Sequence, residues 1–162
     1  MGRKTTEVPR RTSFPTVGEL VAPHVNTLSK HLTRLAVQQA RRRFSLGQVE
    51  WQIITLLGVF QPISIRELTF HALLDQAQVS RAVAALVERG HVLRRRSARD
   101  GREAELTLTP QGMSLHADLS IAAIRRNKYL LEGVSSDEIH KFIQMLDMLS
   151  DRARTLLDSN ED

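Results

Sequence analysis

The sequence predicts a mainly helical fold with one small pair of β-strands. Apolar residues recur three and four positions apart over most of the 162 residues, which is the period of an amphipathic helix. Several helix starts are marked by a serine with glutamate or glutamine three residues later, or by a threonine before proline. The strongest hairpin signal is Asp100-Gly101, because both residues tolerate a positive φ. A short hairpin among helices is therefore expected.

Composition limits the class of protein. With 41% hydrophobic residues, a chain of this length can bury a core of its own. No apolar run approaches the roughly 18 to 20 residues that span a bilayer, and the N-terminus lacks the apolar core of a signal peptide, so we expect a cytoplasmic protein without a membrane partner. The absence of cysteine excludes disulfides, thiolate zinc sites and peroxide sensing through a thiol. The net charge of +5 comes with clustered arginines, which suggest an anionic partner such as nucleic acid.

The N-terminal part is expected to be a tail followed by a long helix. Residues 1–16 mix arginine, lysine and proline, and we expect a disordered basic tail. A plainly solvated tail is favoured over an arm that reaches DNA. Residues 17–42 are predicted to be helical, and Pro23 either begins the regular part or kinks it. The apolar residues form a coiled-coil-like seam at Val21, Val25, Leu28, Leu32 and Leu35.

A second helix is expected over residues 45–60. Its start fits a capping box, Ser45-Leu46-Gly47-Gln48. The helix is apolar nearly all round, which is typical of a helix buried at the centre of a domain. Gln61-Pro62 then ends it.

Two short helices follow in tandem. The first opens with a capping box formed by Ser64 and Glu67 and is expected to end near residues 71–73. The second begins after Asp75 as its N-cap and stops at Gly90. The inward face of this second helix is an apolar stripe of Val79, Val83, Leu86 and Val87.

The outer face of the second short helix is polar near its N-terminus. It carries Gln76, Ala77, Gln78, Ser80 and Arg81. Glutamine pairs with adenine edges, arginine with guanine or phosphate, serine with either, and alanine contacts a thymine methyl group in the major groove. Ser64 and Arg66, at the start of the preceding helix, are placed to hold a phosphate. Most such faces are simply solvated, and for this helix alone that interpretation is favoured.

The segment after this helix favours DNA binding over a merely solvated face. Residues 92–96 and 103–108 are expected to form two strands joined through Asp100-Gly101. The expected cross-strand pairs are Leu93 with Leu108, Arg95 with Leu106 and Arg96 with Glu105.

Arginines gather on this hairpin. Arg99 and Arg102 flank its tip, and Arg94 and Arg96 are expected to be flanking phosphate contacts. Asp100 is expected to set the turn and to orient a neighbouring arginine. A hairpin of this kind is a wing, which places positive charge in a minor groove or along the phosphate backbone. The helix pair and the wing together predict a winged helix-turn-helix DNA-binding domain.

The C-terminal part predicts two further helices. Thr109 before Pro110 starts a long helix that ends near Gly133, and a capping box formed by Ser135 and Glu138 starts the last helix. The last helix has its own seam of Ile139, Phe142, Leu146, Leu149, Ala153 and Leu156. Seams at opposite ends of the chain are most simply explained if they pack together and against a second subunit. The expected organisation is a basic tail, an N-terminal dimerisation helix, a winged helix-turn-helix domain and C-terminal dimerisation helices, at 1–16, 17–44, 45–109 and 110–162.

At this point the chain resembles the MarR family of winged helix-turn-helix regulators, over about residues 28–157. Residues 44–51, 73–81 and 86–92 carry part of the resemblance. The family's wing signature, Asp-x-Arg shortly before Leu-Thr-x-x-Gly, is matched by Asp100, Arg102, Leu108, Thr109 and Gly112. The middle position is often arginine in the family and is Gly101 here, so one wing contact is missing unless Arg99 substitutes for it.

The resemblance implies a homodimer that holds two winged domains over a pseudo-palindromic operator in double-stranded DNA. The recognition helices of such a dimer lie about 34 to 36 Å apart, because they meet successive major grooves. Family members are mostly repressors released by a small effector, often an aromatic acid, bound in a cleft between the dimer helices and the DNA-binding domain. The alternative is a constitutive or architectural DNA-binding protein without an effector.

Other sites are less well marked. A carboxylate effector would have to be received by His24, His31 or an arginine, and by resemblance Trp51 would line the cleft, although core packing is the simpler role for Trp51. The histidines show no metal-ligand spacing, so we expect no metal and no cofactor. The sequence has no phosphate-cradling glycine loop, nucleophile elbow or zinc triad, so we do not expect an enzyme.

Overall fold

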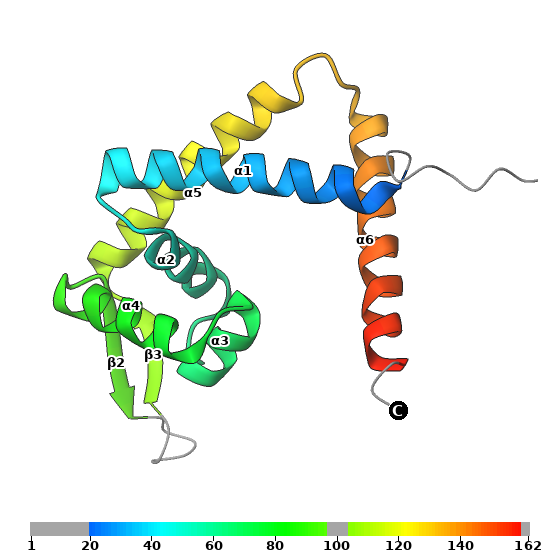
Figure 1. Ribbon diagram of the computed structural model, residues 1–162. Helices are drawn as coiled ribbons and strands as arrows, with labels where there is room; N and C mark the ends of the chain where they lie inside the picture. Colours follow the sequence, from blue (N-terminus) through cyan, green and yellow to red (C-terminus); the bar gives the residue numbers. More distant parts are fainter. Residues whose placement is uncertain (1–19, 97–103, 160–162) are drawn as a thin grey trace, which may run out of the picture. The chain divides into compact units, whose positions relative to one another are not determined.

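The computed structural model describes residues 20–96 and 104–159. These ranges hold six helices and three short strands (Figure 1). In chain order the elements are α1 (Val21–Phe44), α2 (Gln48–Phe60), β1 (Ile63–Ser64), α3 (Ile65–Ala72), α4 (Gln76–Glu88), β2 (Val92–Arg96), β3 (Ala104–Leu108), α5 (Pro110–Leu130) and α6 (Ser136–Ser159). The predicted fold class, mainly helical with a small β wing, is confirmed. The predicted tail at 1–16 and the wing-tip residues Arg99, Asp100, Gly101 and Arg102 lie outside the described residues.

The end of α1 corrects the predicted start of the second helix. Ser45 does not cap that helix; its backbone is left-handed (φ 55°, ψ 35°) and it closes α1, with its amide donating to the Arg41 carbonyl at 3.2 Å. α2 begins only at Gln48, where the Gly47 amide donates to the Glu50 carboxylate at 2.7 Å. A glutamate three residues after the cap is one half of a capping box. The cap is therefore shifted by two residues from the predicted position.

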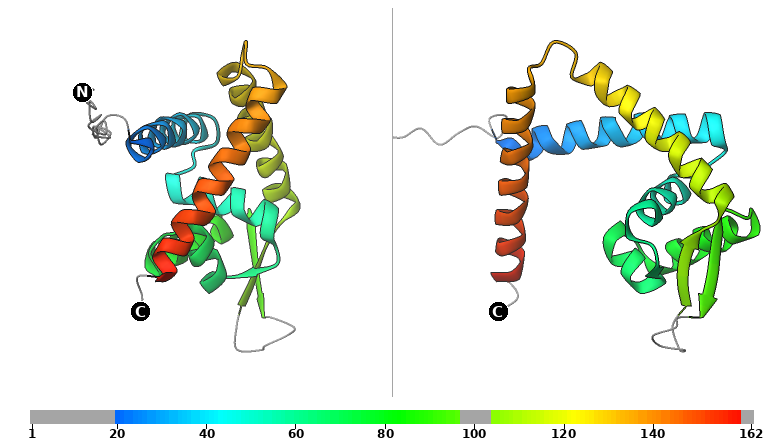
Figure 2. Two further views of the ribbon diagram at one scale, coloured as in Figure 1. Left: turned by 90° about the vertical axis from the view of Figure 1, so that its right-hand side faces the viewer. Right: turned by 180° about the vertical axis from the view of Figure 1, so that it is seen from behind.

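The chain divides into two compact units, Met1–Trp51 and Gln52–Asp162. In the second unit, α3 contacts α4, α4 contacts β2 and α3 contacts β3, as the views in Figure 2 show. Fully buried aliphatic side chains from α2, α3, α4 and β3 form the core: Ile53, Ile54, Leu57, Leu68, Val79, Leu86 and Leu106. Val87, predicted to face this core, is 38% exposed, because it lies on the flank of α4 beside the buried row.

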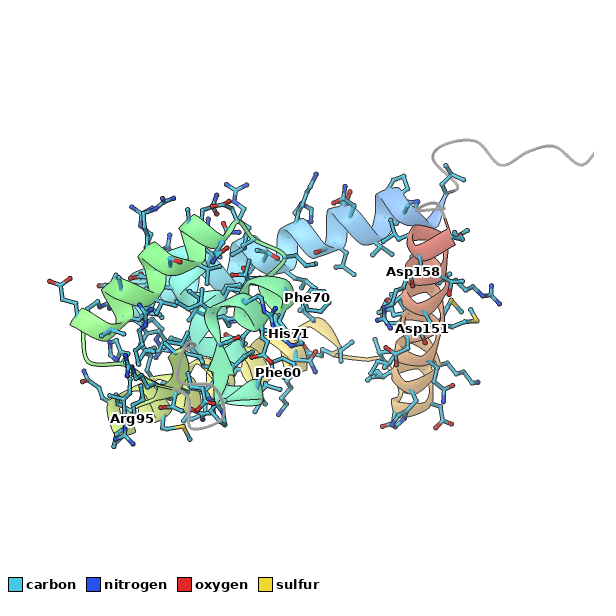
Figure 3. The ribbon with its side chains drawn as sticks, turned by 90° about the horizontal axis from the view of Figure 1, so that it is seen from below. Phe60, Phe70, His71, Arg95, Asp151 and Asp158 are labelled. Atoms are coloured by element: carbon cyan, nitrogen blue, oxygen red, sulfur yellow. The ribbon has the colours of Figure 1, made fainter. Side chains whose placement is uncertain are left out.

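The C-terminal end of α3 is fastened to α2 by side-chain contacts. The Gln52 Nε2 donates to the Ala72 carbonyl at 2.8 Å. Near the end of α2, the Phe60 ring stacks on the His71 ring with centroids 4.2 Å apart, as Figure 3 shows. These contacts hold α3 in place ahead of the turn into α4.

The sheet has three antiparallel strands in the order β1-β3-β2, one strand more than the sequence predicts. β1 has only two residues, too few to show the alternation by which a strand is recognised. The β2–β3 register also differs from the predicted one by one residue. The pairs are Val92 with Leu108, Leu93 with Thr107, Arg94 with Leu106, Arg95 with Glu105 and Arg96 with Ala104.

Burial explains this register. Val92, Leu106 and Leu108 are buried, whereas Leu93 is 36% exposed. Alternate residues of a strand face opposite sides of the sheet, so the three buried residues must share one face. The predicted pairing assumed a two-residue turn and put Leu93 on that face.

The turn between α3 and α4 holds an exposed leucine in an unfavourable conformation. Leu73 is left-handed (φ 52°, ψ 42°) and its side chain is 87% exposed. A non-glycine residue pays about 1 to 2 kcal/mol in this region, and an exposed side chain regains nothing by burial. We expect Leu73→Gly to raise the free energy of unfolding by about 0.5 to 1 kcal/mol, measured by guanidinium denaturation. Ala84→Gly, inside α4, is the control and is expected to lower it by about 1 kcal/mol. Destabilisation by both substitutions would contradict the strain at Leu73.

The last two helices begin at their predicted caps. The Thr109 Oγ1 accepts from the Gly112 amide at 3.0 Å, and Pro110 lies in the first turn of α5. Before α6, the Ser135 amide donates to the Glu138 carboxylate at 3.0 Å, and the Glu138 amide donates to the Ser135 hydroxyl at 3.3 Å. Hydrogen bonds from the Ser135 hydroxyl and amide lower the pKa of Glu138. Both predicted N-caps are confirmed.

The apolar seams of α1 and α6 are exposed in the single chain. The seam residues of α1 are between 37% and 55% exposed. Pro23 lies in the first turn of α1, where a proline costs no helical hydrogen bond. α6 has no buried residue, and its Phe142 and Leu156 are 50% and 64% exposed. Apolar surface of this extent usually marks an interaction site. No helix within the described ranges is both long and apolar enough to span a membrane.

Candidate nucleic-acid interface

The start of α3 is fixed by a reciprocal cap. The Ser64 hydroxyl donates to the Glu67 carboxylate at 2.8 Å and accepts from the Glu67 amide at 3.2 Å, while the Ser64 amide donates to the same carboxylate at 2.9 Å. The hydrogen bonds that the Ser64 amide and hydroxyl donate to the Glu67 carboxylate lower the pKa of Glu67. Ser64 is 6% exposed, and its hydroxyl takes part in the cap. Arg66, the second residue of α3, is the exposed member of the predicted Ser64–Arg66 pair.

The N-terminus of α4 is held by Asp75. One carboxylate oxygen accepts from the Ala77 amide at 2.9 Å and from the Gln78 amide at 3.1 Å, which confirms the predicted N-cap. Ala77 and Arg81, four residues apart, lie opposite the buried Val79 and Val83 and form the outermost row of the helix.

The other predicted base-reading residues lie on the two flanks of α4. Gln76 and Ser80 share one flank by their four-residue spacing, and Gln78 lies on the other. Gln76 and Gln78 are exposed, whereas Ser80 is half-buried. The helix thus presents amides on both sides of the Ala77–Arg81 row.

Side chains from α3, α4 and the sheet surround a cleft of about 340 Å³. It is lined by Ser64, Ile65 and Arg66 at the start of α3, Gln76 and Ser80 on α4, and Arg94 and Ala104 on β2 and β3. Two guanidinium groups therefore approach one polar cleft beside the outer face of α4. Guanidinium groups beside neutral hydrogen-bonding side chains suit a phosphate of the DNA backbone next to a base edge.

The observed strand register decides which wing arginines turn toward this cleft. Arg94 and Arg96 share a face of β2 with the buried Val92, and Arg94 reaches the cleft. Arg95 lies on the opposite face across from Glu105, and in Figure 3 it lies on the side of the strands away from α4. The sequence interpretation had included Arg94 and Arg96 as flanking contacts and had omitted Arg95.

The root of the wing is joined to α4 and α5 by a small set of close contacts. The Thr109 hydroxyl donates to the Gly90 carbonyl at 2.6 Å, and the Thr109 amide donates to the His91 carbonyl at 3.1 Å. A Cβ atom at Gly112 would collide with the same His91 carbonyl oxygen. The threonine and the glycine of the Leu-Thr-x-x-Gly signature therefore have a structural role, because they bring the first turn of α5 against the end of α4.

The predicted effector residues lie on α1 and α2. His24 and His31 are exposed on α1, and Trp51 is half-buried on α2. In the unit Met1–Trp51, a cleft of about 340 Å³ is lined by Ser29, Lys30, Thr33, Arg34, Val37, Gln38 and Gln48. Sequence reasoning missed its two cations, because charged residues along a helix are usually solvated. Among the described residues, no group of three or more histidines and carboxylates is arranged to hold a metal ion.

Comparisons with known proteins point in the same direction. Residues 44–103 match the model of the MarR family. No curated protein matches the sequence. A MarR/EmrR family transcriptional regulator from Acinetobacter sp. ADP1 superposes with a TM-score of 0.75 and 26% identity over 87% of this chain and 99% of that chain. The MarR protein from Peptoclostridium difficile DA00132 gives 0.74 and 18%, over 90% and 96%. The PcaV transcriptional regulator from Streptomyces coelicolor, solved in complex with its natural ligand, gives 0.62 and 22%, over 86% and 99%.

Proposed function

The chain has the winged-helix fold of the MarR-family transcriptional regulators, and from this premise we propose that it is a homodimeric repressor that binds a specific double-stranded operator. The observation that carries this proposal is the cleft in which Arg66 and Arg94 meet Gln76 and Ser80 beside the exposed face of α4. The arginines hold the backbone, and the side chains of α4 read base edges in the major groove.

The dimer is supported by the exposed seams. An isolated subunit would leave the apolar residues of α1 and α6 in water, and a second copy related by a two-fold axis covers the same surface on both chains. The two α4 helices of this dimer would meet successive major grooves about 34 to 36 Å apart, which requires a pseudo-palindromic operator.

The effector is proposed to be a small organic acid that releases the repressor. Lys30 and Arg34 give the α1 cleft two cations for a carboxylate, while His24, His31 and Trp51 remain the alternative predicted from the sequence. A relative of similar fold, PcaV, was solved with its natural ligand. The second candidate function is a constitutive or architectural DNA-binding protein, in which no effector changes DNA affinity. We assign no reaction and no cofactor, and we place the protein in the cytoplasm.

The test is operator discrimination by Gln78, which is exposed on the flank of α4 away from the cleft. The parent protein is first used to select its operator from random duplexes, and affinities are measured by fluorescence anisotropy. A glutamine that pairs with a base edge contributes about 1 to 3 kcal/mol of discrimination at one base pair. Gln78→Ala is therefore expected to bind variants at that position with nearly equal affinity. Gln111→Ala, an exposed glutamine on α5, is the control and should discriminate like the parent.

Two results would count against this proposal. If the parent enriches no sequence from the random duplexes, binding is not sequence-specific and the architectural alternative is favoured. If Gln78→Ala discriminates as the parent does at every operator position, the base-reading role of Gln78 is wrong.

A further inference from the structure

Gln61 lies where three elements of the winged domain meet. It follows the last residue of α2, and its backbone amide donates to the Leu57 carbonyl at 3.2 Å, which attaches it to the end of that helix. Its side-chain Oε1 accepts from the backbone amide of Leu108, the last residue of β3, at 2.7 Å. Its Nε2 donates to the Met113 Sδ in the first turn of α5 at 3.4 Å. One side-chain amide thus connects α2, the wing and α5.

The register of the sheet explains why a side chain is needed there. β1 pairs with β3 as Ile63 with Leu106 and Ser64 with Glu105, so residue 61 would be the next partner of Leu108 on that edge. β1 begins only after Pro62, which has no amide hydrogen to donate. The Gln61 side chain supplies the acceptor that a longer β1 would have supplied. Leu108 is only 9% exposed, so its amide requires a partner within the protein.

Because of the position of Leu108, its hydrogen bond with Gln61 affects the wing. Leu108 pairs with Val92 at the start of β2, two residues before Arg94, and Thr109 follows it at the cap of α5. Whatever fixes the Leu108 amide therefore fixes the root of the strand pair that carries Arg94 and Arg96. Since interaction with a phosphate depends on the placement of the charge, a loose root weakens the wing contacts even when the fold is kept.

We propose that Gln61 is a positioning residue for DNA binding: its amide anchors the wing root to α2 and α5 and holds Arg94 and Arg96 at the DNA backbone. This inference rests on the proposed function, and it adds a residue that does not touch DNA. It also gives α2 and α5, which lead to the helices with exposed seams, a direct connection to the wing.

The test compares two matched glutamine variants. Gln61→Met keeps the length of the side chain and removes the amide. Gln52→Met, the control, removes a hydrogen bond of similar length that fastens α3 to α2 and does not touch the wing. Amide hydrogen exchange at Leu108 and the salt dependence of binding to the selected operator are measured at a temperature at which circular dichroism shows both variants folded.

Gln61→Met is expected to speed exchange at Leu108 at least about tenfold, because the amide loses its acceptor. It is expected to weaken operator binding about tenfold and to reduce the slope of log K against log salt by about 0.9, the loss of one phosphate contact. Gln52→Met should leave the exchange at Leu108 as in the parent and should reduce the slope less than Gln61→Met does. Gln61→Glu retains an acceptor for Leu108 and should restore slow exchange and the parental slope.

The opposite results overturn the proposal. An unchanged salt slope in folded Gln61→Met, or an equal reduction in Gln52→Met, would show that Gln61 has only a general structural role. If Gln61→Met does not fold, Met113→Leu removes the second partner of the amide. Faster exchange at Leu108 in that variant supports the anchor and unchanged exchange contradicts it. Absence of salt-dependent DNA binding by the parent would refute the proposed function, and the exchange measurements would still decide whether the anchor exists.

Discussion

Replacement of Gly112 by alanine is expected to lower the free energy of unfolding by about 3 kcal/mol, the upper part of the range for overpacked sites. Helix propensity alone predicts the opposite sign, because alanine is favoured over glycine inside a helix by about 1 kcal/mol. The steric term prevails because the added Cβ would collide with the His91 carbonyl oxygen, which is backbone and cannot rotate away. Relief of the collision requires α5 to move from the end of α4, which strains the Thr109 hydrogen bonds to Gly90 and His91.

The measurement is guanidinium denaturation followed by circular dichroism, with two controls. Ser114→Ala replaces an exposed residue in the same part of α5 and should change stability by less than about 0.5 kcal/mol. Gly58→Ala would bring a Cβ atom into the His116 ring, a side chain that can change rotamer, so its cost should be smaller than that of Gly112→Ala. A Gly112→Ala protein as stable as the parent would show that the contact with His91 does not constrain α5.

The parts of the fold that the sequence predicted correctly are those fixed by local interactions. The caps at Ser64, Asp75 and Thr109 each involve a side chain and an amide two or three residues away, and all three are present. The same reasoning gave a wrong N-cap at Ser45. A serine before a helix can also close the preceding helix in a left-handed conformation, and Ser45 does so. In the sequence, the position of Glu50, three residues after Gly47, is the signal that distinguishes these two roles.

The parts that failed depend on residues far apart in the chain. The β2–β3 register depends on which face of the sheet the helices cover, and this is the face that holds Val92 and Leu106. A turn motif does not determine that face. β1 forms because Ile63 and Ser64 pair with β3, which lies about forty residues later in the sequence. A local hydrophobic period cannot predict such a pairing. The Gln61 bridge to Leu108 was missed for the same reason.

In the candidate interface too, single residues could be predicted from local sequence, whereas their arrangement in space could not. Arg66 and Arg94 were each predicted as a phosphate contact on separate grounds, one from a helix start and one from a charged strand. Their approach to a single cleft with Gln76 and Ser80 depends on the packing of α3, α4 and the sheet, and the sequence does not encode it locally. The effector residues rested on resemblance and residue type alone, and the cleft found on α1 is lined by other side chains.

Combined substitution of Arg66 and Arg94 by alanine is expected to reduce the salt slope of operator binding by about 1.8, because each phosphate contact contributes about 0.9. Affinity near physiological salt should fall on the order of a hundredfold, from the loss of two charge-assisted contacts of about 1.5 kcal/mol each. Discrimination between operator variants should remain, because Gln78 and Arg81 still present their side chains on α4.

Arg95→Ala is the matched control for this double variant, since it removes the same charge from the same strand but on the face turned away from the cleft. If only net charge matters, Arg95→Ala and Arg94→Ala will weaken binding equally, and the cleft has no special role. If the cleft holds a phosphate, Arg94→Ala will lower both affinity and slope more than Arg95→Ala does. The losses of binding free energy in Arg66→Ala and Arg94→Ala should add up to the loss in the double variant when the two arginines bind separate phosphates. Their sum should be smaller than the loss in the double variant when they share one phosphate. Additivity in this experiment therefore measures how many phosphates the cleft holds, in addition to whether it binds DNA.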